Sequence, residues 1–185
     1  FTMTPSPAVA RAIELLRQAK HAVALTGAGI STPSGIPDFR SPDSGVWEQV
    51  DPMEVASIYG FRHNPSAFFE WIQPLTHTIL NAQPNPAHHA LASLEANGRL
   101  SAIITQNIDL LHSRAGNNTV YEVHGSINRA TCQGCHDQFD GLMMWHKFSS
   151  NGQLPTCANC GHILKPNMIL FGEMLPTLVI HAAQQ

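Results

Sequence analysis

Short apolar runs alternate with helical patterns along much of the chain. The pattern predicts strands at residues 21–26, 102–105 and 119–123, and the first two are expected to be buried. The run around Ile103 and Ile104 is the most clearly that of a buried parallel strand. Ser6-Pro7 begins a predicted helix with an apolar stripe, and Asn85-Pro86 begins another that leads into the second strand. This alternation indicates an α/β fold built on a Rossmann-like parallel sheet.

Residues 41–81 have a different pattern, with aromatic residues between turn signals. A helix is expected from Asn64-Pro65 onward, with Phe68 and Phe69 on its apolar face. Pro74 is expected to bend or shorten this helix. An aromatic helical insertion of this kind could line a substrate groove, although a hydrophobic core is the commoner explanation.

Composition excludes several classes of protein. The chain has 185 residues, of which 43% are hydrophobic and 12% charged, so an ordered domain with a sizeable core is expected. The net charge of -3 and the lack of a long basic run argue against direct nucleic-acid binding. No run approaches the roughly 18 apolar residues that a membrane helix needs, and no leader is recognised. We therefore expect a cytoplasmic protein without a membrane partner.

Polar residues follow two of the predicted strands. Gln106, Asn107 and Asp109 come directly after the second strand, and His124 follows the third. Ligands of open α/β sheets bind outside the carboxyl ends of the strands, so these groups are candidates for ligand contacts. His124 is placed where a general base would act near neutral pH. The alternatives are an ordinary Asn/Asp turn and a structural histidine.

The first strand runs into a glycine-containing turn, Gly27-Ala28-Gly29-Ile30-Ser31. A strand followed by Gly-x-Gly begins a dinucleotide-binding turn, because glycine lets backbone N–H groups approach a pyrophosphate. The match is partial, since the next glycine is Gly35, and a plain glycine turn explains the string nearly as well.

Asp38, Phe39 and Arg40 follow this turn directly. Arg40 could bind phosphate oxygens through its guanidinium group, and Phe39 could cover a flat heterocycle. The alternative is a solvated loop with a local pair between Asp38 and Arg40.

The four cysteines of the chain form two C-x-x-C knuckles separated by 21 residues. Four thiolates at such spacing predict a tetrahedral structural zinc site, which leaves no coordination position open for chemistry. Cys135-His136 also completes a haem-attachment string, and a thioredoxin-like redox pair is a further alternative, but neither explains both knuckles. The predicted ligands are Cys132, Cys135, Cys157 and Cys160.

Taken in order, these motifs resemble those of the sirtuins, the NAD-dependent protein deacylases. The resemblance runs from about Val9 to the last residue and includes Phe171-Gly172-Glu173 near its end. It implies a Rossmann-like part formed by residues 1–43, 82–128 and 165–185. A small module would combine a helical insertion at 44–81 with a zinc-binding segment at 129–164, and the acyl-lysine peptide would bind in the cleft between the two parts.

The resemblance also implies roles for individual residues. His124 would be the general base, and Asn107, Ile108 and Asp109 would hold the nicotinamide carboxamide. Gly27, Ala28, Gly29 and Ile30 would surround the phosphates with Arg40, while Asp38 and Phe39 border the nicotinamide end and Gln106 reaches the ribose. Phe171, Gly172 and Glu173 would contact the acyl-lysine substrate. NAD would be the co-substrate, zinc would be structural, and the products would be nicotinamide, free lysine and O-acyl-ADP-ribose.

Two features depart from the family pattern. In sirtuins the Rossmann sheet continues beyond the point that Gln185 reaches, so the adenosine-binding half of the domain is expected to be missing from this sequence. The family branch that prefers acidic acyl groups carries Tyr-x-x-Arg where this chain has Phe69-Glu70-Trp71-Ile72. We therefore expect acetyl or other uncharged acyl groups as substrates.

Two other functions fit parts of the sequence. Mono-ADP-ribosyl transfer would also cleave NAD but would leave ADP-ribose on a protein side chain. A zinc-ribbon adaptor without catalysis would use the cysteine module alone, and its binding to DNA or RNA would depend on salt.

Overall fold

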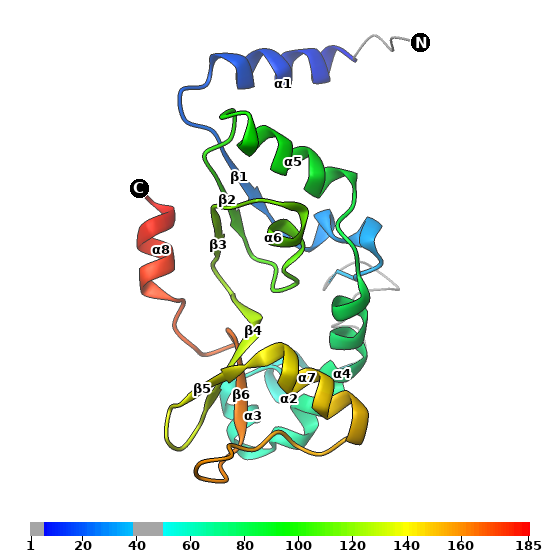
Figure 1. Ribbon diagram of the computed structural model, residues 1–185, viewed down its shortest axis with the longest axis vertical. Coiled ribbons are helices and arrows are strands. Elements are labelled where there is room, and N and C mark those ends of the chain that lie inside the picture. Colours follow the sequence, from blue (N-terminus) through cyan, green and yellow to red (C-terminus); the bar gives the residue numbers. More distant parts are fainter. Residues whose placement is uncertain (1–5, 39–49) are drawn as a thin grey trace.

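The computed structural model describes residues 6–38 and 50–185, and its strands form two separate sheets (Figure 1). The parallel sheet contains β1 (Val23–Thr26), β2 (Ala102–Thr105) and β3 (Val120–Glu122), in the order β1-β2-β3. Thr26 pairs with Thr105, and Thr105 pairs with Glu122, so the three strands end at one edge. This arrangement confirms the predicted α/β class.

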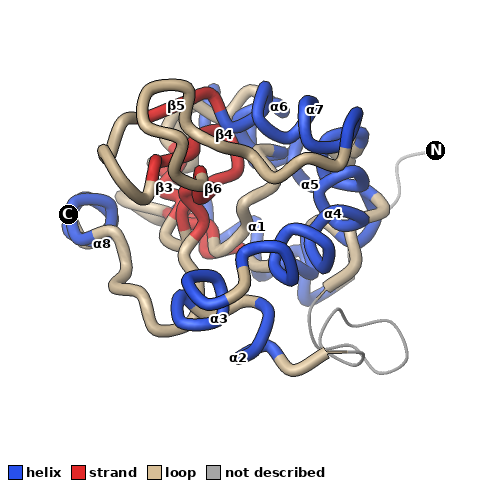
Figure 2. The backbone as a smooth tube through the Cα atoms, turned by 90° about the horizontal axis from the view of Figure 1, so that it is seen from below, coloured by secondary structure: helices blue, strands red, loops and turns tan. Residues whose placement is uncertain are grey.

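Four helices accompany the parallel sheet: α1 (Pro7–Gln18), α5 (Pro86–Ala96), α6 (Leu111–Ala115) and α8 (Thr177–Ala183). The predicted cap of α1 is present, since the Ser6 hydroxyl accepts from the Val9 amide. In both views α8 lies on the opposite side of the strands from α4 and α7 (Figures 1 and 2). The helix α8, near the end of the sequence, packs beside β3.

The second sheet is antiparallel, with strand order β5-β4-β6. It contains β4 (Gly125–Cys132), β5 (Gln138–Asp140) and β6 (Leu164–Met168), with α7 (Gly141–Asn151) connecting toward the second cysteine knuckle. The strand β6 pairs with β4 and so belongs to the cysteine-bearing sheet. The segment after the second knuckle therefore joins this sheet and not the parallel one. Strand pairing thus links segments that the sequence assigns to different parts.

The helical insertion contains α2 (Pro52–Val55), α3 (Ile58–His63) and α4 (Pro65–Asn81). Phe61, Phe68 and Phe69 are buried in one apolar cluster with Trp145 and Phe148 of α7. Phe68 and Phe69 meet edge-on with ring centroids 5.2 Å apart. The insertion and the cysteine-bearing sheet therefore share a hydrophobic core.

Two expectations about these elements need correction. Of the two effects expected of Pro74, shortening does not occur, because α4 continues past it to Asn81. The strand at 21–26 is not buried throughout, because β1 is an edge strand whose Leu25 is 70% exposed. None of the residues of α1 is buried by the described part of the chain.

No helix among the described residues combines the length and apolar character needed to cross a membrane.

Candidate active site

A cavity of about 590 Å³ lies where the carboxyl edge of the parallel sheet meets the helical insertion and the segment after β6. The polar groups in its wall come mainly from loops that follow β1, β2 and β3. The apolar groups come mainly from α4 and from the segment at 168–175. The described lining residues are Ala28, Ser31, Ile36, Pro37, Asp38, Ala56, Trp71, Ile72, Leu75, Ile79, Gln106, Asn107, Ile108, Asp109, His124, Met168, Ile169, Leu170, Phe171, Gly172, Glu173 and Leu175.

The loops converge because parallel strands present their carboxyl ends at the same edge. Gln106 begins the loop after β2, and its amide donates to the Thr26 carbonyl at the end of β1 over 3.0 Å. The Val123 amide, just after β3, donates to the Thr105 carbonyl over 3.0 Å. His124, Asn107 and Asp109 are thereby brought to one cavity from positions far apart in the sequence.

Three buried side chains form a hydrogen-bonded group on this wall. The Asn107 Nδ2 donates to Ser31 Oγ over 3.1 Å and to the Gly27 carbonyl over 3.2 Å. The Ser31 hydroxyl donates in turn to Asp109 Oδ2 over 2.6 Å. Both N–H groups of the Asn107 amide are therefore engaged by protein. Within the described part of the chain, its carbonyl oxygen accepts no hydrogen bond and is available to a ligand.

Asp109 is also held by the backbone that follows it. Its Oδ1 accepts from the Leu111 amide over 2.9 Å, which fixes the carboxylate at the start of α6. Leu110 between them has a φ of 64°, in the left-handed region that a branched side chain seldom adopts. Strain of this kind often accompanies functional loops, and here it lies immediately beside the cavity.

His124 is half-buried and lies in the same wall. Its Nδ1 is 3.2 Å from the Gln106 carbonyl oxygen, an acceptor that favours the tautomer with the proton on Nδ1. Nε2 is then left without a proton and can accept one. The backbone on the other side is fixed as well, since the Ile169 amide donates to the His124 carbonyl over 2.8 Å.

The glycine turn forms two short 3₁₀ segments, at Ala28–Ile30 and Thr32–Ser34. Ala28 lines the cavity, whereas Gly29 and Ile30 lie on the same turn outside the lining. A Cβ added to Gly29 would meet nothing of the described chain within 4 Å. Packing therefore does not require this glycine, and the space beside it is open to a ligand.

The helix α4 contributes to both the core and the cavity. Phe68 and Phe69 are fully buried in the shared core, while Trp71, Ile72 and Leu75 line the cavity. The expected hydrophobic core is therefore present, and α4 also lines the cavity, partly with the same residues.

The residues expected to contact substrate, Phe171, Gly172 and Glu173, all line the cavity. The Phe171 backbone forms a parallel bridge with Ser57, in which the Phe171 amide donates to the Ala56 carbonyl and the Ile58 amide donates to the Phe171 carbonyl, each over 2.9 Å. The Glu173 carboxylate is already engaged, since Oε2 lies 2.8 Å from Lys165 Nζ.

The four cysteines form a compact cluster away from the cavity, with all Sγ atoms within 4.8 Å of one another. The Cys132–Cys160 and Cys135–Cys157 Sγ separations are 3.4 and 3.6 Å. These distances are too long for disulfides and near the roughly 3.8 Å expected around tetrahedral zinc.

Backbone donors surround this cluster. Burial of Cys132 opposes ionisation, but the amides of Cys135 and Gly134 and the thiols of Cys160 and Cys135 lower its pKa to about 6, while the pKa of Cys135 in the same cluster is raised. A thiol that ionises readily is suited to bind a cation. The four cysteines are thus positioned to bind a zinc ion, as the spacing predicted.

Sequence reasoning did not identify a buried group beneath the cavity loops. Thr26 Oγ1 lies 2.9 Å from His112 Nε2, and the rings of His112 and His88 meet with centroids 4.9 Å apart. Burial lowers the pKa of both histidines, so they are suited to stay neutral. His88 and His112 lie 24 positions apart in different helices, and no spacing rule connects them.

The predicted site residues that the structure describes are therefore distributed as follows. Most of them line one cavity, and the Gly27 carbonyl accepts from Asn107 beside it. Those that line the cavity are His124, Asn107, Ala28, Asp38, Gln106, Ile108, Asp109, Phe171, Gly172 and Glu173. Phe39 and Arg40 lie outside the described residues.

Residues 27–185 match the family model described as the Sir2 family. The chain is 47% identical over 179 residues to NAD-dependent protein deacylase 2 of Archaeoglobus fulgidus, a match that covers 95% of this chain and 68% of that protein. It is 40% identical over 176 residues to NAD-dependent protein deacetylase 2 of Caldanaerobacter subterraneus subsp. tengcongensis, covering 95% and 70%.

The solved structures that resemble this chain are also Sir2 proteins. One described as "Structural Basis for the Mechanism and Regulation of Sir2 Enzymes" is similar with a TM-score of 0.86 and 48% identity, covering 94% of this chain and 68% of that one. Another, described as "Sir2-p53 peptide-NAD+", is similar with a TM-score of 0.83 and 39% identity, covering 94% and 68%. On the family match, the identities and the shared fold, this chain belongs to the Sir2 family, the sirtuins.

Proposed function

We propose that this chain is an NAD-dependent protein lysine deacylase, which transfers the acyl group from lysine to ADP-ribose and releases nicotinamide. The observation that carries the proposal is the single cavity lined by His124, Asn107 and Asp109 in a chain of the Sir2 family. Relatives are named NAD-dependent protein deacylases and deacetylases. Similar Sir2 structures are described with p53 peptide and NAD+, or with deacetylated p53 peptide and 3'-O-acetyl ADP-ribose.

The residues present fit NAD in two respects. The open space beside Gly29 leaves room for the cofactor's phosphates to approach the backbone of the turn after β1. The free carbonyl oxygen of Asn107 and the fixed carboxylate of Asp109 are suited to accept from the carboxamide N–H groups of nicotinamide. NAD would supply a ribose carbon that becomes electrophilic as nicotinamide departs.

His124 is proposed as the general base. With Nδ1 donating to the Gln106 carbonyl, Nε2 can take the proton of a ribose hydroxyl as that hydroxyl attacks the acyl carbon. The half-buried position in the cavity wall limits competition from bulk water.

The apolar side of the cavity is proposed to bind the acyl-lysine. Trp71, Ile72 and Leu75 can cover the aliphatic stem and an uncharged acyl group. The described lining residues include no lysine or arginine, so the described wall offers no cation to an acidic acyl group. This supports acetyl and other uncharged acyl groups as substrates.

Zinc is proposed to be structural. Four thiolates complete a tetrahedral shell, and none of the four cysteines is among the residues lining the cavity. Free thiol ligands fit a reducing compartment, and we propose a cytoplasmic location. Proteins or peptides carrying acylated lysine are the proposed partners, without direct nucleic-acid or membrane binding.

Nicotinamide release by the purified protein tests this function. Nicotinamide should appear only when both NAD and an acetyl-lysine peptide are present, together with deacetylated peptide and O-acetyl-ADP-ribose in equal amounts. ADP-ribose attached to protein, with the acetyl group still on the peptide, would instead identify a mono-ADP-ribosyltransferase.

A further inference from the structure

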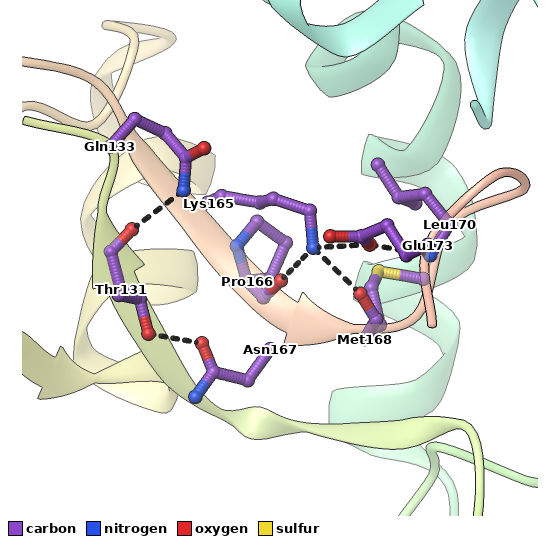
Figure 3. A network of polar contacts seen from close by, with 8 residues as sticks. All are labelled: Thr131, Gln133, Lys165, Pro166, Asn167, Met168, Leu170 and Glu173. Carbon is purple, nitrogen blue, oxygen red and sulfur yellow. Dashed lines mark hydrogen bonds and ion pairs between the residues drawn. The ribbon is translucent and has the colours of Figure 1, made fainter. Parts of the chain in front are cut away.

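An ion pair between the buried Lys165 and the partly exposed Glu173 lies on the substrate side of the cavity. Lys165 on β6 is 6% exposed, and its Nζ lies 2.8 Å from Glu173 Oε2 (Figure 3). The same ammonium group donates to the Met168 carbonyl over 2.9 Å and to the Pro166 carbonyl over 3.2 Å. All three ammonium protons therefore have acceptors, two of them on the backbone of β6.

The carboxylate of Glu173 joins this pair to the chain that follows. Its Oε2 also accepts from the Leu170 amide over 2.8 Å, and the Glu173 amide donates to the Leu170 carbonyl over 3.0 Å. Residues 170–173 thus form a turn that is closed by backbone and side chain and is tied at its end to Lys165.

This turn is part of the cavity wall, whereas the lysine that holds it is not. Every residue of the segment 168–173 lines the cavity, and Lys165 does not. The segment also contacts two other parts of the site. The Ile169 amide donates to the carbonyl of His124, and Phe171 bridges to Ser57 in the helical insertion.

Energetics argue against a role in overall stability. An ion pair with a buried ammonium group loses much of its hydration and is often no more stabilising than apolar residues of similar volume. Lys165 meets its desolvation with one carboxylate and two carbonyls, all belonging to residues that close or precede the turn. The arrangement therefore specifies a conformation of the segment.

We propose that Lys165 and Glu173 are positioning residues that fix the segment 168–173 in the conformation that receives the acyl-lysine peptide. This inference rests on the proposed function and refines it. Glu173, which the sequence suggested as a direct substrate contact, acts through the backbone that its carboxylate holds. The pair sets the affinity for peptide and leaves the chemical step at His124 unchanged.

Three variants separate positioning from a general effect on folding. Lys165→Met and Glu173→Met each remove one partner, and the double variant removes both, so that no unpaired charge remains buried. Each should raise the KM for acetyl-lysine peptide about tenfold, while kcat and the KM for NAD stay within about twofold. Lys147→Met, an exposed lysine on α7, is the matched control and should leave all three constants unchanged.

The double variant gives the decisive comparison. If the pair matters only because one buried charge needs the other, the double variant should regain both thermal stability and a normal peptide KM. If the pair positions the segment, the double variant should regain stability and keep the raised KM. A normal peptide KM in folded single variants, or its recovery in the double variant, overturns the proposal.

Amide hydrogen exchange tests the positioning role without relying on catalytic activity. In Lys165→Met the amides of Leu170 and Phe171 should exchange faster than in the wild type, while amides of β2 keep their protection. If the wild type releases no nicotinamide with acetyl peptide, the proposed function fails. The exchange rates still decide whether the pair holds the segment, and unchanged rates reject that role.

Discussion

The hydroxyl of Ser31 donates a 2.6 Å hydrogen bond to the carboxylate of Asp109, a residue 78 positions away in the sequence. The bond joins the loop after β1 to the loop after β2, and the same hydroxyl accepts from Asn107. One serine therefore orients both groups that are proposed to hold the nicotinamide carboxamide.

Ser31→Ala should accordingly weaken NAD binding more than it slows chemistry. Loss of the donor leaves Asp109 Oδ2 and Asn107 Nδ2 without their shared partner, and we expect the KM for NAD to rise about tenfold. Steady-state kinetics with NAD varied at saturating peptide measure this. Ser149→Ala, at an exposed serine of α7, is the control, and an unchanged KM for NAD would show that Ser31 does not orient the pocket.

His124→Ala should reduce kcat by about a thousandfold, the size of effect typical of losing a general base. Zinc content and the thermal unfolding transition should stay unchanged, because the ring lies in the cavity wall and not in the core. The exposed His146 provides a matched alanine variant. Retention of more than about a tenth of the activity by His124→Ala would assign the base to another group.

Removal of zinc should unfold the antiparallel sheet that carries the cysteine knuckles. The four cysteine sulfurs lie within 4.8 Å of one another, and without the ion the loss of its ligand bonds destabilises β4, β5 and β6. Hydrogen exchange with and without a chelator measures this. Unchanged protection of these strands after complete loss of zinc would rule out the structural role.

Deacetylation should be faster than desuccinylation. The apolar part of the described wall carries Trp71, Ile72 and Leu75, and no lysine or arginine is among the described lining residues, so a succinyl carboxylate there would be desolvated without a partner. Competition between acetylated and succinylated forms of one peptide gives the ratio directly. Faster removal of succinyl would show that a cation outside the described wall reaches the acyl group.

Stability should also depend on Glu122 of β3. Its burial and the nearby charge of Asp109 raise its pKa to about 7, although the Ser126 hydroxyl opposes the shift. A carboxyl whose pKa rises on folding stabilises the fold fully below its unfolded pKa, and this contribution is lost as the pH rises through about 7.

Glu122→Gln removes the ionisable carboxyl group, and with it the loss of stability that the wild type shows as the pH rises. Relative to the wild type, its free energy of unfolding should increase by roughly 2 kcal/mol between about pH 5 and pH 8. Denaturant unfolding at several pH values measures the difference, with Glu70→Gln on the exposed face of α4 as control. A constant difference between Glu122→Gln and wild type across this range would contradict the raised pKa.

Local patterns in the sequence predicted much of the candidate site and of the secondary structure. Strand ends identified Gln106, Asn107, Asp109 and His124, because parallel strands must place the residues after them at one edge. Paired C-x-x-C knuckles identified the zinc cluster, since chelation requires thiolates at short and regular spacing. The caps at Ser6 and Asn85 and the helix start at Asn64-Pro65 are present as predicted, because they depend only on side chains within one turn.

Contacts between distant segments were decided only by the tertiary structure. Neither the bond from Ser31 to Asp109 nor the contact of His88 with His112 has a sequence signal, because both depend on how separate loops and helices pack. The same holds for the pairing of β6 with β4, which places the segment after β6 beside His124. Sequence determined which chemical groups this chain possesses, and packing of non-local elements determined which of them meet.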